Sequence, residues 1–166
     1  MRKTPESPVM ARSAVFSPCR RYRYQLGREW SGGGKTCVFI GLNPSKADET
    51  RDDPTIRRCI RYAREWGYDR LVMVNLFAYR STKPAWLARA DNPVGEENNK
   101  YLLKVCRSAD LLIAAWGNHG ALHRRDQAVK QLLSEFVIKC LKLTKLGHPA
   151  HPLFLPKSVK PVAFQY

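Results

Sequence analysis

The chain has 166 residues, a length that fits one domain with a single hydrophobic core. Lys and Arg number 29 against 14 Asp and Glu, and the net charge of +15 is too biased for an ordinary metabolic enzyme. The charge predicts a polyanionic partner, with nucleic acid ahead of an anionic membrane. The alternative is a basic protein whose charge serves only its solubility.

The five cysteines are scattered along the chain, and no two of them form a C-x-x-C pair. An odd number of cysteines, several of them in apolar runs, favours reduced core thiols over disulfides, zinc ligands or iron–sulfur ligands. No apolar run approaches the length of a membrane span, and no apolar signal-peptide core is found near the start. We therefore expect a cytoplasmic monomer that has no cofactor, no metal and no membrane contact.

The first elements in chain order are an arm and two strands. Residues 1–20 are polar, contain proline and lack periodicity, which predicts a flexible N-terminal arm. Residues 21–26 alternate basic and aromatic side chains, the pattern of a half-exposed edge strand. Residues 37–42 form a continuous apolar run, which is typical of a strand covered on both faces.

A helix follows, because Asp53 can cap it and Pro54 suits its first position. Its apolar residues lie on one stripe, and its arginines lie mostly outside that stripe, which indicates an amphipathic helix with a basic outer face. We expect Arg57, Arg58 and Arg61 to contact the phosphates of a nucleic acid. The alternative is an ordinary solvated face.

The rest of the chain continues the alternation of strands and helices. The expected elements are a strand at 71–77, a helix at 91–107, a strand at 110–116, a helix at 121–138 and a short strand at 140–143. This order predicts a single α/β domain over residues 21–166, a three-layer αβα sandwich with a mainly parallel four-stranded sheet. In such sheets, ligands bind beyond the carboxyl ends of the strands.

Each predicted strand runs into distinctive polar residues. They are Asn43 after the first apolar strand, Asn75 in the second, Asn118 and His119 after the third, and His148 and His151 after the fourth. Parallel strands would bring these side chains to one edge of the sheet. Amide and imidazole groups with almost no carboxylate suit a neutral, planar, hydrogen-bonding ligand such as a nucleobase. Each residue alone has a simpler structural explanation, but the set favours a composite pocket.

Four acidic residues stand out in this basic chain and leave one alternative open. They are Asp48, Glu49, Asp52 and Asp53. Such a cluster can hold a divalent ion. Against this, Asp53 has a role as a helix cap and no histidine lies nearby in the sequence.

The segments GLNP, VMVNLFAYR, LLIAAWGNHGA and LGHPAHPL, in this order, resemble the motifs of the uracil-DNA glycosylase superfamily. The resemblance covers residues 37–153. The chain more closely resembles the DUF1643 family of bacterial and phage proteins, through RYRY, LNPS-x-AD, DDPTIRRC, WGY, VNLFA and GHP-x-HPL. The superfamily resemblance implies a uracil-DNA glycosylase-like αβα fold with a pocket for a base.

The resemblance also implies roles for individual residues. Asn43 matches the position that holds or activates a water molecule, Asn75 the position that reads a pyrimidine edge, and His148 or His151 the donor to the base oxygen. The base-binding candidates are completed by Gly41, Leu42, Pro44, Phe77, Asn118 and His119, and the nucleic-acid-binding candidates by Leu153 and Phe154. A base in a duplex has to be flipped to reach such a pocket.

These observations predict a protein that recognises a nucleobase in a nucleic acid, DNA in preference to RNA. One form of this hypothesis is a DNA base-excision glycosylase, a hydrolase of DNA repair. A second is an enzyme that processes nucleotides or modified bases in DNA modification. A third is a non-catalytic nucleic-acid-binding module.

Overall fold

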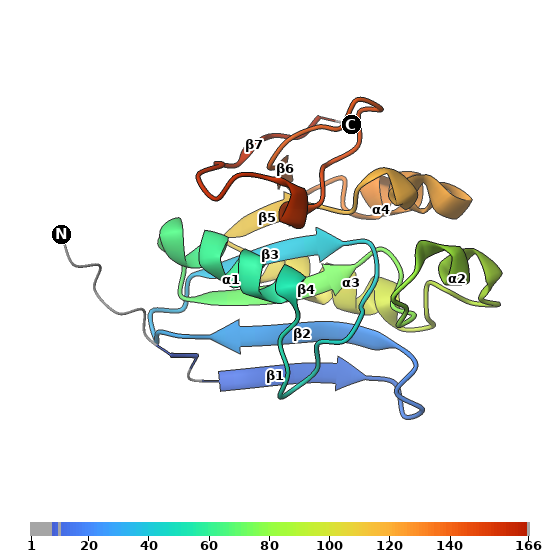
Figure 1. Ribbon diagram of the computed structural model, residues 1–166, viewed down its shortest axis with the longest axis horizontal. Helices are drawn as coiled ribbons and strands as arrows, with labels where there is room; N and C mark the ends of the chain where they lie inside the picture. Colours follow the sequence, from blue (N-terminus) through green and yellow to red (C-terminus); the bar gives the residue numbers. More distant parts are fainter. Residues whose placement is uncertain (1–7, 10, 166) are drawn as a thin grey trace.

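The computed structural model describes residues 8–9 and 11–165. In that range the strands form one seven-stranded sheet, with the order β1-β2-β4-β3-β5-β6-β7 (Figure 1). The strands are β1 Ala11–Phe16, β2 Arg23–Glu29, β3 Thr36–Gly41, β4 Arg70–Asn75, β5 Leu111–Ala114, β6 Lys139–Cys140 and β7 Val162–Ala163.

The central strands of the sheet are parallel and the outer ones are antiparallel. β3 pairs in parallel with β4 and β5, and β5 pairs in parallel with β6. β1, β2 and β7 add antiparallel pairings at the two sides. The four-stranded sheet that the sequence predicts is therefore wrong in size. The four parallel strands are present, and β2 overlaps the strand expected at residues 21–26, but β1 lies in the segment expected to be a flexible arm and β7 has only two residues.

Four α-helices and two 3₁₀-helices connect the strands in the described range. They are α1 Pro54–Glu65, α2 Pro84–Arg89, α3 Asn98–Arg107, η1 Asn118–Arg124, α4 Arg125–Leu132 and η2 Pro152–Phe154. The predicted start of α1 is confirmed: Asp53 Oδ1 accepts a hydrogen bond from the Ile56 amide at 2.9 Å, and Pro54 occupies the first helical position. None of these helices is long and apolar enough to cross a membrane.

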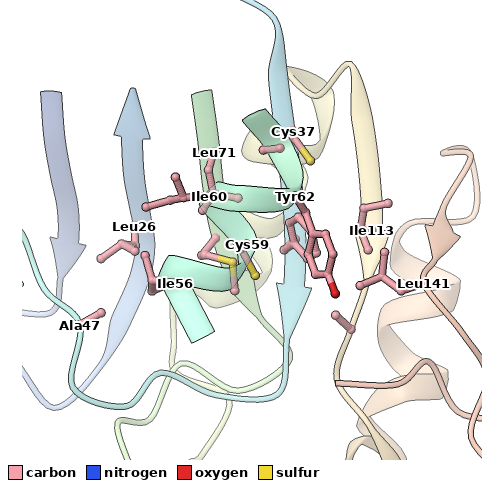
Figure 2. Close-up of a cluster of buried hydrophobic side chains, with 14 of the residues drawn as sticks. Leu26, Cys37, Ala47, Ile56, Cys59, Ile60, Tyr62, Leu71, Ile113 and Leu141 are labelled. Carbon is pink, nitrogen blue, oxygen red and sulfur yellow. The ribbon is translucent and has the colours of Figure 1, made fainter. Parts of the chain in front are cut away.

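Apolar residues cover both faces of the sheet, so the structure is a mixed α/β fold with helices on either side (Figure 1). On one face, Ile56, Cys59 and Ile60 of α1 pack against strand residues such as Leu71 and Ile113 (Figure 2). On the other face, α2, α3 and α4 contribute Leu87, Leu102 and Val129 to a second cluster. The sheet is thereby fixed between two cores, and its carboxyl edge is held in place.

The N-terminal segment differs from the prediction of a flexible arm. Residues 11–16 form β1, which pairs with β2 along its whole length, while residues 1–7 and 10 lie outside the described part. β2 is therefore not an edge strand, and Arg23 and Arg28 are buried, with 3% and 1% of their surfaces exposed. The alternation of basic and aromatic residues predicted a half-exposed edge strand. This pattern carries no information about β1, which pairs with β2.

Two predicted helices are shorter than expected. The first begins at Asn98 rather than Asp91, because Gly95 adopts a φ of 86° and its amide bonds to Asn92 Oδ1 at 3.2 Å. The second is interrupted because His123 and Arg124 adopt φ angles of 54° and 55°. Left-handed residues of this kind end a regular helix. α2 was not predicted, since six residues carry too little periodicity.

The five cysteines are free thiols, and four of them are core residues as predicted. Cys19 is exposed, and Cys37, Cys59, Cys106 and Cys140 are buried. Burial raises the pKa of the Cys106 thiol to about 12, so this thiol stays protonated at neutral pH. The buried cysteines therefore act as small apolar core residues.

Candidate functional site

A cavity of about 630 Å³ opens where β3, β4 and β5 end. The start of α1 and the η2 segment complete its wall, through Thr55 and Pro152. Eight residues that the sequence singled out line it: Gly41, Leu42, Asn43, Asn75, Asn118, His119, His151 and Phe154. Parallel pairing explains this convergence, since the carboxyl ends of β3, β4 and β5 lie at one edge.

Other predicted site residues lie outside this cavity. His148 approaches Asp126 of α4, with 3.8 Å between Nδ1 and the carboxylate oxygen. Phe77 is fully buried in the core cluster on the opposite face from α1. Pro44 is buried, and its carbonyl accepts from the Ser81 amide at 2.9 Å.

The arginines of α1 lie along the helix rather than at the cavity. Arg57 is exposed, Arg58 donates to the Leu155 carbonyl at 2.7 Å, and Arg61 pairs with Glu65 at 3.2 Å. Leu153 is exposed in η2, beside the cavity residue Phe154. Contact between these residues and a nucleic acid stays a prediction.

Asn75 is the most distinctive polar group of the cavity. It ends β4 with 3% of its surface exposed, and its backbone carbonyl accepts from Asn98 Nδ2 at 3.0 Å. Among the described residues, its side-chain amide has no hydrogen-bond partner. Asn75 Oδ1 lies 2.7 Å from the point where a Cβ atom on Gly41 would stand. The absence of a side chain at residue 41 therefore makes room for an amide whose donor and acceptor are both open to a ligand.

Two hydrogen bonds fix the orientation of the Asn43 side-chain amide. Its Nδ2 donates to the Pro44 carbonyl at 3.0 Å and to the Ser81 carbonyl at 2.8 Å. Both partners only accept, so the nitrogen and oxygen of this amide are distinguished. The amide oxygen has no partner among the described residues and remains able to accept a hydrogen bond from a water molecule or a ligand.

His151 is held in one tautomer. Its Nδ1 accepts from the Leu153 amide at 3.2 Å, which places the ring proton on Nε2. Burial lowers the pKa of His151, and the opposing effect of the Asp53 carboxylate is smaller. The ring is therefore a neutral donor at neutral pH. It packs against Phe154, whose ring is 5.6 Å away between centroids and is 85% exposed at the cavity.

Among the cavity residues that the sequence analysis did not predict, Arg23 and Trp116 each carry a buried donor without a partner. Only 3% of the Arg23 surface is exposed. Its Nη1 donates to the Ala47 carbonyl at 2.9 Å, and its Nε has no partner. Burial lowers the pKa of Arg23 to about 10, so it is protonated at neutral pH. Trp116 also lines the cavity, and its buried Nε1 has no partner. No periodic pattern distinguishes such residues from exposed or core ones.

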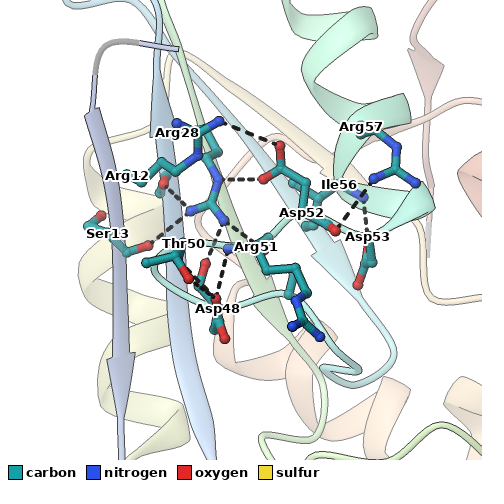
Figure 3. A network of polar contacts seen from close by, with 12 residues as sticks. Arg12, Ser13, Arg28, Asp48, Thr50, Arg51, Asp52, Asp53, Ile56 and Arg57 are labelled. Atoms are coloured by element: carbon teal, nitrogen blue, oxygen red, sulfur yellow. Dashed lines mark hydrogen bonds and ion pairs between the residues drawn. The ribbon is translucent and has the colours of Figure 1, made fainter.

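The acidic residues near α1 serve a different purpose from metal binding. Arg28 reaches from β2 to the loop before α1, with its Nε bonded to Asp52 Oδ1 at 2.7 Å (Figure 3). Its Nη2 donates to the carbonyls of Asp48 and Arg51 at 2.5 and 3.1 Å. This buried guanidinium fixes the loop that leads into α1.

The four carboxylates are directed to separate partners. Asp52 pairs with Arg28, Asp53 caps α1, Asp48 accepts from the amides that follow it, and Glu49 pairs with Arg20. Among residues 8–9 and 11–165, no group of three or more His, Cys, Asp or Glu is placed to hold a metal ion. The geometry therefore does not favour the divalent-ion alternative.

A family model described as "Protein of unknown function (DUF1643)" matches residues 23–153. The chain belongs to the DUF1643 family. Searches of curated proteins and of solved structures found no match. The part matched by the family model begins at the buried Arg23 and includes Asn43, Asn75 and His151, while Phe154 follows its last residue.

Proposed function

We propose that the protein binds a nucleobase of a nucleic-acid strand, DNA in preference to RNA, in the cavity at the carboxyl edge of the sheet. The observation that carries this proposal is the buried, unpartnered amide of Asn75 above Gly41. The Asn75 side chain lines the cavity without a partner among the described residues, and an amide offers one donor side and one acceptor side. The edge of a base satisfies both.

Further groups of the cavity suit the same ligand. The neutral His151 offers Nε2–H to a base oxygen, and the exposed ring of Phe154 offers a stacking surface. The motif order resembling the uracil-DNA glycosylase superfamily supports the proposal, and so does the arrangement of helices on both faces of a parallel core. We accordingly propose that the fold is a three-layer αβα sandwich of the uracil-DNA glycosylase-like type.

The charge of the protein supports a nucleic acid as the source of the base. A second hollow, of about 560 Å³, shares Ser45, Ser81 and Thr82 with the cavity. Its basic residues are Arg20, Lys46, Arg51 and Arg80. Phosphates of a strand in this hollow would release counterions and strengthen binding, while one nucleotide turns its base into the cavity.

Hydrolysis of the N-glycosidic bond is a second candidate function, favoured by the orientation of Asn43. Its amide oxygen can accept a hydrogen bond from a water molecule that attacks C1′ of the sugar, and the proton that this water loses ends on the departing base. As the bond from C1′ to the base nitrogen breaks, the base leaves with the electron pair, and His151 Nε2–H hydrogen-bonds to its oxygen. A donor placed at developing negative charge typically accounts for about 10²–10³ in rate.

The test of base binding uses fluorescent oligonucleotides, single-stranded and duplex, that carry uracil, a mismatched thymine or an abasic site at one position. We expect the oligonucleotides with a base to bind at least about tenfold more tightly than the abasic one, and Asn75→Ala to remove this difference. Equal affinity of the wild-type protein for all of them would contradict base recognition.

The test of catalysis is single-turnover release of the base by the wild-type protein, Asn43→Ala and His151→Ala. Hydrolysis predicts a loss of rate much larger than the loss of affinity in both variants. Binding without release rejects the glycosylase form, and turnover on free nucleotides instead supports an enzyme that processes nucleotides.

A further inference from the structure

The cavity contains a buried positive charge that base recognition does not use. Arg23 lines the cavity, and among the described residues its guanidinium makes one hydrogen bond, from Nη1 to the Ala47 carbonyl, which occupies only part of its donors. Its Nε is buried without a partner. A buried cation in this state lacks the hydrogen bonds that normally offset its loss of solvation.

No carboxylate of the described residues forms an ion pair with Arg23. Asp53 also lines the cavity, and its charge favours the protonated arginine, but its Oδ1 is bonded to the Ile56 amide at the start of α1. The charges of Arg28 and Arg80 act in the opposite sense. An acceptor from outside the chain is therefore needed to complete the contacts of Arg23.

We propose that Arg23 forms a subsite for an oxyanion, a carboxylate or a phosphate, that belongs to the same ligand as the base on Asn75. This inference rests on the proposed function and extends it to the substrate class: a nucleobase or nucleotide with an anionic group. Guanidinium groups bind carboxylates and phosphates through paired, charge-assisted hydrogen bonds. The cavity volume of about 630 Å³ lies in the range of sites for ligands of drug size, which leaves space beside a single base.

The position of Arg23 supports this role over general attraction to anions. Exposed basic residues of a protein with a net charge of +15 attract any anion, but dissolved salt screens this attraction. Arg23 is 3% exposed and acts only on a group that enters the cavity. Its contribution should therefore persist at high ionic strength.

The experiment measures the affinity of 2′-deoxyuridine, its 5′-monophosphate and 5-carboxy-2′-deoxyuridine by calorimetry, at an ionic strength of about 0.5 M to screen exposed charges. Inorganic phosphate alone is the fourth probe. We expect one of the two anionic nucleosides to bind about 10- to 100-fold more tightly than the neutral nucleoside. A preference for the monophosphate identifies a phosphate subsite, and a preference for the carboxylated base identifies an anionic substituent on the base.

Arg23→Gln should abolish this preference and leave the affinity for the neutral nucleoside within about twofold, while Arg23→Lys should keep part of it. Arg64→Gln is the matched control, because Arg64 also has a buried Nε without a partner but lies outside the cavity. The control should keep the full preference. Far-UV circular dichroism and thermal unfolding establish that each variant is folded.

The outcomes separate this inference from the proposed function. Asn75→Ala should weaken all three nucleosides alike, and its failure to do so counts against base recognition only. Equal affinity of the wild-type protein for neutral and anionic nucleosides, or no binding of either anionic nucleoside, overturns the oxyanion subsite without any variant. Equal losses for neutral and anionic nucleosides in Arg23→Gln also overturn it, because they indicate a purely structural role.

Discussion

Asn75 Oδ1 lies 2.7 Å from the position of a Cβ atom on Gly41, and the two residues are partners in the register of β3 and β4. A contact this close cannot be kept if residue 41 gains a side chain. The open amide of Asn75 therefore depends on glycine at the end of the neighbouring strand. This pair links the sheet register directly to the chemistry of the cavity.

Gly41→Ala should displace the Asn75 side chain and lower the affinity for a base by at least about tenfold. Overpacking at this site should also reduce the free energy of unfolding by about 1–3 kcal/mol. The checks are oligonucleotide binding and urea denaturation. Gly32→Ala is the control, since a Cβ atom there meets nothing within 4 Å. Unchanged base affinity in Gly41→Ala would show that the close contact between Gly41 and Asn75 is not needed for ligand binding.

Asn98→Ala should mainly lower the free energy of unfolding, whereas Asn75→Ala should mainly lower the affinity for a base. Asn98 is fully buried and donates to the carbonyls of Asn75 and Leu76, each at 3.0 Å, so its loss should cost about 2–3 kcal/mol of unfolding free energy. The Asn75 amide has no partner among the described residues, so its loss should cost less than about 1 kcal/mol and should mainly reduce base affinity. Urea denaturation and binding curves on both variants decide this. A large stability loss in Asn75→Ala would indicate a structural amide.

The convergence of polar residues could be predicted because it follows from parallel pairing. Asn43 and Asn75 each follow or end an apolar strand, and neighbouring parallel strands place such residues at one edge. The apolar runs and the capping pair Asp53 and Pro54 were sufficient to locate β3, β4 and α1. No pattern was needed beyond the apolar runs and the chemistry of the helix start.

The rest depended on contacts between distant segments. Arg23 was expected on an exposed strand face, and only the pairing of residues 11–16 with β2 shows that this strand is interior. The sequence left the choice between His148 and His151 open. In the structure, His148 follows a turn in which Gly147 has a φ of 84°, and it approaches Asp126, while His151 lines the cavity. Periodicity carries no information about either arrangement.

The stability of the protein should depend on His151 at mildly acidic pH. Burial lowers the pKa of His151 below the ordinary value of 6.5, so the unfolded chain takes up this proton at a higher pH than the folded protein. The free energy of unfolding should therefore fall as the pH drops below about 6.5, by at most about 1.4 kcal/mol per pH unit for one proton.

His151→Asn keeps an acceptor for the Leu153 amide and removes the titration, so its stability should fall less between pH 7 and pH 5 (about two pH units). Chemical denaturation across this range provides the measurement. His123→Asn is the control, because His123 is exposed and asparagine tolerates its φ of 54°. Parallel curves for the wild-type protein and His151→Asn would contradict the prediction.

Arg28→Met should be strongly destabilising. It removes the 2.7 Å ion pair with Asp52, leaves the Asp48 carbonyl without its donor, and leaves the Arg51 carbonyl with only the Asp48 amide. Breaking a buried pair of this kind costs about 3–5 kcal/mol. Arg20→Met removes the pair with the half-exposed Glu49 and should lower the free energy of unfolding far less, because solvent screens this pair. Urea denaturation compares the two, and similar midpoints would show that the buried network contributes little.

The salt dependence of nucleic-acid binding should identify the path of the strand. If phosphates lie in the hollow beside the cavity, a double change of Arg51 and Arg80 to Gln should reduce the slope of log K against log salt by about 1–2. The same double change at Arg57 and Arg61 on α1 should have a smaller effect. Fluorescence anisotropy at several salt concentrations measures both. The reverse order would place the strand along α1, as the sequence alone predicted.

The two edges of the sheet come from the two ends of the chain, β1 and β7. β1 covers β2 from Ala11 to Phe16, so a shortened protein that begins at Arg21 would expose a row of unpaired backbone N–H and C=O groups along β2. An uncovered edge of this kind is a template for pairing between molecules. A protein cut at residue 21, the start of the domain that the sequence predicts, would thus retain every residue of the cavity but would be prone to aggregation.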